Sequence, residues 1–203
     1  MTFNPLLKII FTLLMVAGLA LAGCKEAPES RAALKGATAV SMAAIAAEAK
    51  GFAVGSQMSA RTVYVFFDAQ CPHCGALWEA AKPLKSQAKF VWIPVGILNP
   101  SSTAQGATLL AASDPVAAMD AHEASLLAHQ GGLSAAGGID AHKAVIAKNT
   151  ELFNRFGFAS IPTIVGVNPR DGVLVTQEGA MPTAALATLL GLQVPAGQPA
   201  APP

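Results

Sequence analysis

The sequence has 203 residues, a length that suits one domain, and 53% of its residues are hydrophobic while 12% are charged. Its 13 Lys and Arg residues balance 12 Asp and Glu residues, so no basic surface can neutralise a phosphate backbone and nucleic acid is excluded as a partner. Beyond the N-terminus, no stretch reaches the roughly 18 uncharged apolar residues of a spanning helix, which excludes a polytopic membrane protein.

The N-terminus has the form of an export signal. Lys8 precedes an apolar core at 9–22, and Cys24 comes directly after Leu-Ala-Gly. This order resembles the bacterial lipobox, in which the cysteine becomes the lipid-bearing first residue. We therefore expect residues 1–23 to be a lipoprotein signal peptide and Cys24 to carry lipid. An ordinary cleaved signal or an uncleaved anchor is the alternative; in each case the domain works outside the cytoplasm.

Downstream, strand and helix patterns alternate. Residues 24–36 are polar and predict a tether, residues 37–192 a domain, and the Pro/Ala-rich residues 193–203 a disordered tail. Apolar alternation and β-branched runs predict strands at 52–54, 62–67, 90–95, 161–167 and 173–177. Helical spacing predicts helices at 37–50, after the second cysteine, at 102–112, 115–129, 141–156 and 182–190. The three helices between 102 and 156 form an inserted helical subdomain.

Two cysteines remain after Cys24, in the order Cys71-Pro72-His73-Cys74 at the end of a predicted strand. A single close pair constrains little chain entropy, so a disulfide that opens and closes is favoured over a structural framework. Zinc usually takes four ligands, and no second ligand pair is present. A haem attachment motif needs histidine directly after the second cysteine, where Gly75 stands. We expect neither a metal nor another cofactor.

The pair lies where a strand leads into a helix, with Pro72 near the first helical position. A thiolate at Cys71 would face free backbone N–H groups and the positive end of the helix dipole, which lower its pKa. Cys71 is therefore the predicted nucleophile, and the more deeply placed Cys74 the resolving thiol. His73 between them is predicted to stabilise the thiolate, with an exposed loop histidine as the alternative. Pro83 either kinks the following helix or ends it.

Several other residues receive simpler interpretations. Asp68 is expected to cap the helix that carries the cysteines, with an effect on the thiols as the alternative, and Trp78 is expected to pack beside the cysteines. We expect the histidines of the insert to lie on the surface: His122, His129 and His142.

The order of these features resembles a known family. A strand ending in Phe-Phe-Asp, then Cys71 to Cys74, a helical insert and an Ile161-Pro162-Thr163 strand opening resemble the thioredoxin fold, and more closely the catalytic domain of the bacterial DsbC/DsbG disulfide isomerases, over residues 52–192. The resemblance implies that Pro162 follows a cis peptide bond beside the cysteines. It also implies that Ile161, Pro162 and Thr163 form the peptide-binding site.

Three features depart from that family. Residues 25–51 are too short to supply the N-terminal dimerisation domain of DsbC and DsbG, so a monomer is expected. The dipeptide Pro72-His73 is like that of the oxidase DsbA, and Ile161 before the proline is like thioredoxin. These cues point to different directions of electron flow.

The leading hypothesis is a lipid-anchored, periplasmic thiol:disulfide oxidoreductase that acts on protein thiols and disulfides as an isomerase or reductase, with a membrane redox partner. A DsbA-like oxidase is the alternative within this class. From another class, Cys71, His73 and Cys74 could bind a soft metal such as copper(I), although Met58, Met119 and Met181 form no Met-rich run. Lys25 after the lipid-bearing cysteine weakly favours the outer membrane.

Overall fold

The computed structural model describes residues 37–197. The predicted signal peptide, Cys24, the whole of the predicted tether and residues 198–203 of the predicted tail lie outside this range. Within it, the elements follow in the order α2 (Met42–Glu48), β1 (Phe52–Gly55), β2 (Thr62–Asp68), α3 (Pro72–Ala81), η1 (Lys82–Leu84), β3 (Lys89–Val95), α4 (Pro100–Ala111), α5 (Pro115–Leu127), α6 (Asp140–Arg155), β4 (Thr163–Asn168), β5 (Val173–Glu178) and α7 (Thr183–Leu189).

The strands form one mixed sheet in the order β1-β3-β2-β4-β5. The central strand β2 runs parallel to β3, with Phe66 opposite Ile93, and antiparallel to β4. The outer strands β1 and β5 pair antiparallel with β3 and β4 respectively. This order brings the end of β2, which leads to the cysteines, next to the start of β4, which follows Pro162.

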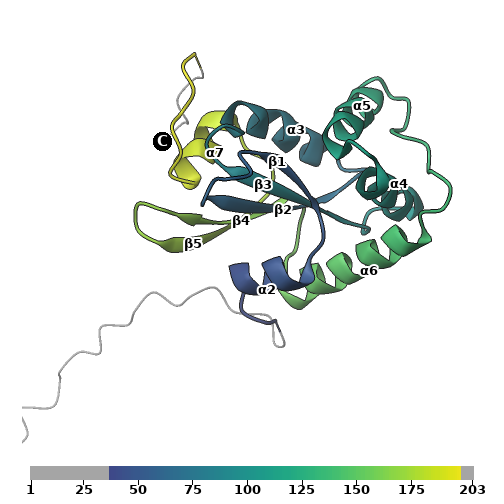
Figure 1. Cartoon of the computed structure of the whole chain (residues 1–203), viewed down its shortest axis with the longest axis horizontal. Helices are drawn as coiled ribbons and strands as arrows, with labels where there is room; N and C mark the ends of the chain where they lie inside the picture. Colours follow the sequence, from purple (N-terminus) through teal and green to yellow (C-terminus); the bar gives the residue numbers. More distant parts are fainter. Residues whose placement is uncertain (1–36, 198–203) are drawn as a thin grey trace, which may run out of the picture. The chain divides into compact units, whose positions relative to one another are not determined.

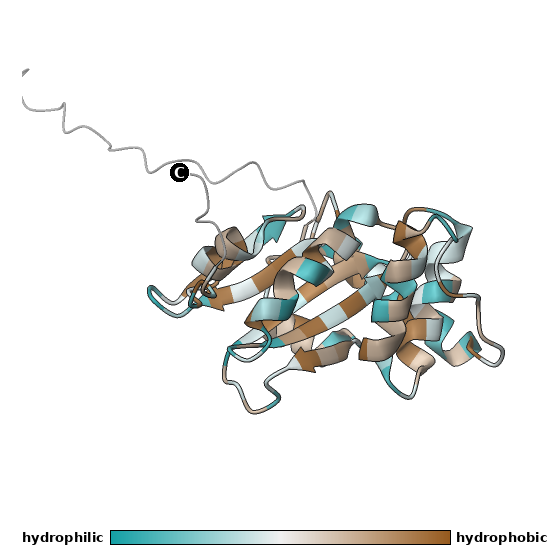
Figure 2. Cartoon of the chain, turned by 90° about the horizontal axis from the view of Figure 1, so that it is seen from above, coloured by the Kyte–Doolittle hydropathy of each residue, from teal (hydrophilic) through white to brown (hydrophobic). Residues whose placement is uncertain are grey.

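Helices cover both faces of the sheet (Figure 1). Helices α3 and α7 lie together on one face, while α6 and α2 lie together on the other. Since both faces are covered, the central strands are apolar along most of their length, and Figure 2 shows this as a brown band through the sheet. Val65, Phe66 and Phe67 on β2 are at most 1% exposed. The core is therefore centred on the strand that positions Cys71.

The predicted insert is present as α4, α5 and α6 between β3 and β4. Helix α4 contacts both α5 and α6, and α6 packs on β3. Asp114 caps α5 by accepting the N–H groups of Val116 and Ala117. The insert is thus anchored on one side to the sheet, while α5 lies at the end of α3 that carries the cysteines (Figure 1).

The predicted elements all occur, and their ends differ by a few residues. The first helix begins at Met42 with Ser41 as its N-cap, five residues later than predicted. Helix α3 ends at Ala81, and Pro83 lies in the following 3-10 turn, so the helix ends near this proline rather than kinking around it. The strand predicted at 161–167 begins at Thr163, because Ile161 and Pro162 precede the pairing with β2.

Candidate active site

Cys71 is the residue directly before α3, and Pro72 is the first residue of the helix. Its backbone is extended, with φ −98° and ψ 111°. Its carbonyl accepts the N–H groups of Cys74 at 2.9 Å and Gly75 at 3.3 Å. Both thiols are free, and both are buried, with 4% of Cys71 and none of Cys74 exposed. The chain therefore places the two sulfur atoms at the first turn of a helix, as the motif predicted.

The two thiols have opposite acidities. A hydrogen bond from the Cys74 thiol is the main cause that lowers the pKa of Cys71 to about 7, against the effect of burial. The backbone N–H groups of Cys74 and His73 lower it further, whereas the charge of Asp68 raises it. Burial, together with the hydrogen bond and charge of Cys71, raises the pKa of Cys74. At neutral pH, Cys71 is thus the thiol that ionises and Cys74 the one that keeps its proton.

His73 and Pro72 are exposed at the end of the helix. The stabilising contact that His73 makes with the Cys71 sulfur comes from its backbone N–H. A donor of this kind is present whichever residue occupies position 73, so the sequence-based role of the imidazole stays a prediction.

The peptide bond between Ile161 and Pro162 is cis, as the resemblance implied. The Cys71 thiol faces this segment and donates to the Ile161 carbonyl, with 3.9 Å between sulfur and oxygen. Thr163 is fully buried and pairs with Phe66 on β2, which fixes the start of β4. The structure therefore brings Cys71, Ile161 and Pro162 together from positions 90 residues apart.

Asp68 does not cap α3, contrary to the sequence-based expectation. Its side chain is fully buried, and Oδ1 accepts the N–H of Gln70 at 2.9 Å. Oδ2 accepts the N–H groups of Ile97 at 2.8 Å and Leu98 at 3.1 Å. The carboxylate ties the cysteine loop to the β3–α4 loop instead, and its charge raises the pKa of both thiols.

His122 is also placed differently from the prediction, because it is fully buried rather than on the surface. Its Nδ1 accepts the N–H of Leu133 at 3.0 Å, and its Nε2 lies 2.6 Å from the carbonyl of Ala69. These two bonds require a neutral ring whose proton is on Nε2. His142 is half-buried, and only His129 is exposed, as predicted. Sequence spacing gave no signal for this contact, since Ala69 and Leu133 lie far from His122 in the chain.

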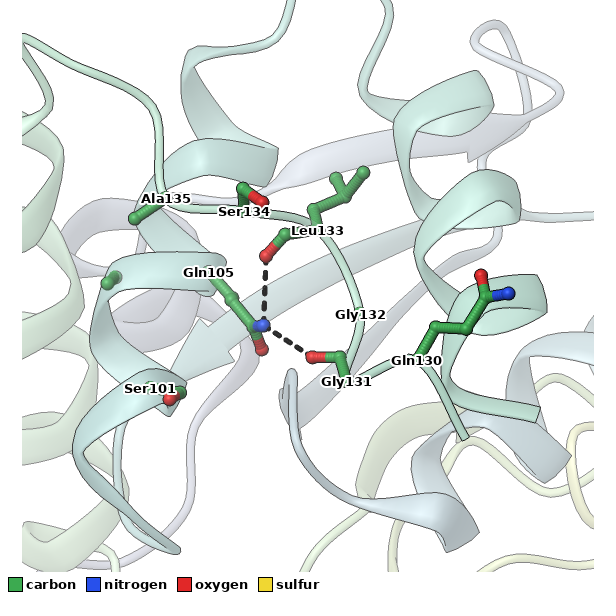
Figure 3. Close-up of a pocket in the computed structure, with 9 residues that line it drawn as sticks. Ser101, Gln105, Gln130, Gly131, Gly132, Leu133, Ser134 and Ala135 are labelled. Carbon is green, nitrogen blue, oxygen red and sulfur yellow. Dashed lines mark hydrogen bonds between the residues drawn. The ribbon is translucent and has the colours of Figure 1, made fainter. Parts of the chain in front are cut away.

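A polar hollow of about 340 Å³ lies beside Gln70, the residue before Cys71. The side chain of Gln105 on α4 donates to the carbonyls of Gly131 at 2.7 Å and Leu133 at 2.9 Å, which holds the loop after α5 (Figure 3). Gln70 also bonds to Gln105 and to the Gly131 carbonyl. The hollow is lined by Ser101, Ala104, Gln105, Gln130, Gly131, Gly132, Leu133, Ser134 and Ala135.

Helix α5 contacts α3 through Trp78, which is buried as predicted. The indole N–H donates to Asp120 at 2.8 Å, and the ring packs edge-on against Trp92 with 5.0 Å between ring centroids. Lys82 forms ion pairs with Asp120 at 2.7 Å and Glu79 at 2.6 Å. These contacts fix the insert beside the cysteine helix.

The described residues hold no group of three or more His, Cys, Asp or Glu side chains placed to bind a metal ion. Over residues 37–197, no helix has the length and apolar character needed to cross a membrane.

Comparison with known proteins places this site in a family. Residues 52–193 match the model of the thioredoxin-like domain family. The thiol:disulfide interchange protein DsbG of Pseudomonas aeruginosa is 36% identical over 137 residues, which cover 64% of this chain and 51% of the relative. DsbG of Escherichia coli is 38% identical over 65 residues, 31% of this chain and 26% of the relative. The chain thus spans about half the length of the Pseudomonas relative.

Solved structures show the same fold at low sequence identity. Proteus mirabilis ScsC in a transitional conformation has a TM-score of 0.58 at 17% identity, covering 92% of this chain and 87% of that one. The catalytic domain of the same protein has a TM-score of 0.53 at 18% identity, covering 73% and 96%. With the family match over residues 52–193 and a cis-proline beside a Cys-Pro-His-Cys pair, this chain belongs to the thioredoxin-like domain family.

Proposed function

We propose that this protein is an extracytoplasmic thiol:disulfide oxidoreductase that acts on protein substrates. Cys71 is its nucleophile, Cys74 its resolving thiol, and Ile161, Pro162 and Thr163 its peptide-binding segment. The observation that carries the proposal is the contrast between the two thiols: an acidic Cys71 beside a cis-proline, above a buried Cys74 with a raised pKa. The 36% identity to a thiol:disulfide interchange protein supports the same chemistry.

The reaction follows from this contrast. The Cys71 thiolate attacks one sulfur of a substrate disulfide, so that bond breaks and one substrate thiolate leaves. Cys74 then loses its proton and attacks Cys71, which releases the second substrate thiol and leaves a Cys71–Cys74 disulfide. Two electrons have passed from the cysteine pair to the substrate. When a substrate thiol attacks the mixed disulfide first, Cys71 is returned unchanged and the substrate is isomerised.

The acidity of Cys71 favours the reductase or isomerase direction. Its pKa of about 7 is similar to that of the thioredoxin nucleophile, about 7, and far above that of DsbA, about 3.5. A more acidic nucleophile stabilises the dithiol form and makes the disulfide more oxidising. We therefore place this protein nearer to reductases and isomerases than to DsbA-like oxidases, and it then needs a membrane partner that keeps the pair reduced.

The predicted location follows from the N-terminus. We propose that lipid on Cys24 anchors a monomeric domain at the periplasmic face of a bacterial membrane. Replacing Cys24 by serine should release the protein to the soluble fraction while leaving disulfide exchange intact. Loss of exchange in that variant would contradict the separation of anchor and catalytic domain.

Trapping of substrates tests the catalytic proposal. Cys74→Ser should accumulate mixed disulfides between Cys71 and periplasmic proteins, because the resolving attack is removed while the first attack remains. The matched variant Cys71→Ser should accumulate none and should fail to reactivate scrambled ribonuclease A. Adducts at Cys74 in the Cys71→Ser protein, or full reactivation by it, would refute the assignment.

A further inference from the structure

Glu123 on α5 is a half-buried acid with one buried carboxylate oxygen, and the exchange chemistry assigns it no role. Its Oε1 atom is inaccessible to solvent and has no hydrogen-bond partner among residues 37–197. An ionised carboxylate in this position would lack the compensation that buried charges normally have. The side chain therefore requires an explanation other than packing.

The carboxylate lies against the first turn of the cysteine helix. A Cβ atom built on Gly75 would come within 2.1 Å of Oε2 of Glu123, so the absence of a side chain at position 75 provides the space for it. Gly75 directly follows Cys74, and its N–H donates to the carbonyl of Cys71. Glu123 is thus held beside the two thiols by the geometry of α3 and α5.

The charged groups around Glu123 belong to α3 and the residue before it, to the 3-10 turn η1, and to α5 itself. Burial is the main cause that raises the pKa of Glu123 to about 7, and the negative charges of Cys71 and Glu79 raise it further. Lys82 lowers it, but that ammonium group is already paired with Glu79 and Asp120. On α5 itself, Asp120 is paired with Lys82, and the neighbouring His122 is neutral in its two hydrogen bonds. The Cys71 thiolate is therefore the charge near Glu123 that changes with the redox state, and this change alters the pKa of Glu123.

We propose that Glu123 is a redox-linked proton site: in the reduced protein, Glu123 and Cys71 hold one proton between them near neutral pH, and Glu123 gives it up when the disulfide forms. The physical reason is that two negative charges close together in a poorly solvated site exclude each other, so the two groups titrate as a coupled pair. This inference rests on the proposed exchange reaction of Cys71 and Cys74.

The balance of the step is as follows. Oxidation joins the sulfur atoms of Cys71 and Cys74, passes two electrons to a substrate disulfide that becomes two thiols, and releases the proton of Cys74. It also removes the thiolate charge, so the pKa of Glu123 falls to the level that burial and its other neighbours set, and the shared proton is released at pH values above that level. Reduction takes up two electrons and, near neutral pH, between one and two protons. Without the acid, it takes up closer to one, because the Cys71 thiolate then needs no compensating proton.

The experiment compares wild type, Glu123→Gln and the control Glu151→Gln in the full chain. The Cys71 thiolate is titrated by its ultraviolet absorbance, and proton uptake on reduction is taken from the pH dependence of the redox potential. Glu123→Gln should raise the thiolate fraction by about two- to fivefold near pH 6, about one unit below the pKa of Cys71, with the curves converging at acid and alkaline pH. Its proton uptake should fall toward one per two electrons. Glu151→Gln, at an exposed position on α6 and on the opposite face of the sheet from α3, should behave as wild type.

A second measurement needs no variant. In wild type, the carboxyl carbon resonance of Glu123 should titrate in two steps in the reduced protein and in one step after oxidation. A single identical step in both redox states, or unchanged thiolate titration and proton uptake in Glu123→Gln, would overturn the inference. If the wild-type pair forms no disulfide with glutathione and none with a protein substrate, the proposed function itself fails, which is a separate result.

Discussion

The sheet side of this molecule and its helical insert contribute different things to one site. Strands β2 and β4 and helix α3 position the two sulfur atoms and the cis-proline segment, to which we assign the exchange reaction and the contact with substrate. Helices α4 and α5 supply groups around them: Gln105, His122 and Glu123. The sheet and α3 thus determine which chemistry is possible. The insert determines the charges around the cysteine pair and the rigidity of the loops beside it.

The largest effect is expected where the two regions meet, at Asp68. Asp68→Asn replaces one acceptor oxygen by an amide donor facing N–H groups, so buried donors in the β3–α4 loop lose their partner. We expect a loss of about 3–5 kcal/mol of unfolding free energy, measured by urea denaturation. Asp171→Asn, which loses part of one exposed turn contact, should change stability by less than about 1 kcal/mol. A similar small change in Asp68→Asn would mean that the two regions are not joined through this carboxylate.

The next effect concerns His122 and depends on pH. Burial holds the pKa of His122 below its ordinary value, although the bond to the Ala69 carbonyl acts in the opposite direction. The unfolded chain then binds a proton below about pH 6.5 that the folded protein does not bind, so this part of the stability falls as pH drops from there toward the folded pKa.

His122→Gln should remove that pH dependence. It should also cost about 1–3 kcal/mol at neutral pH, because glutamine cannot keep both the Leu133 and Ala69 bonds. Urea unfolding at several pH values checks both outcomes, with the exposed His129→Gln as the control. If the stability difference between wild type and His122→Gln does not shrink on acidification, the assignment of a neutral, buried ring is contradicted.

A smaller effect is expected for Gln105, which holds the loop after α5. Gln105→Ala removes the bonds to the Gly131 and Leu133 carbonyls, at a cost of about 1–2 kcal/mol. Backbone amides of residues 130–135 should exchange with solvent about tenfold faster, while those of β2 keep their protection. Gln130→Ala, at an exposed position of the same hollow, is the control. Equal exchange in both variants would show that the loop is held by other contacts.

The smallest effect is expected for the ion pairs of Lys82, despite their short distances. Its side chain is 36% exposed, so water screens the attraction to Glu79 and Asp120. Lys82→Ala should lower stability by no more than about 1 kcal/mol in a thermal melt. A loss several times larger would mean that this lysine, rather than the Trp78–Asp120 bond, fixes α5 on α3.

The sequence was sufficient to predict where the cysteine pair and the cis-proline lie in the fold, because their signals are local. The Cys-Pro-His-Cys order, the preceding apolar strand and the proline before β4 each occupy a few adjacent residues. The surroundings could not be predicted in the same way. Asp68 looked like a helix cap because its true partners, the N–H groups of Ile97 and Leu98, come together with it only through sheet pairing.

Glu123 and His122 show the same limit within the insert. Apolar and polar residues are not separated onto different faces of α5, so its sequence does not indicate which side faces α3. The contact of Glu123 depends on the missing side chain of Gly75, 48 positions earlier, and that of His122 on a loop and a strand end. Such pairings are properties of the tertiary packing, so no local pattern announces them.

The contact between Cys71 and Ile161 has a consequence for the chain before it folds. The two residues lie 90 positions apart, so an unfolded copy of the chain has the cysteine pair without the Ile161–Pro162 segment beside it. In that copy, Cys71 also lacks the ordered helix turn that lowers its pKa, and it behaves as an ordinary thiol with a pKa of about 8.5. The unfolded chain therefore carries less Cys71 thiolate at neutral pH than the folded domain, and the acidity of this thiol arises only with the fold.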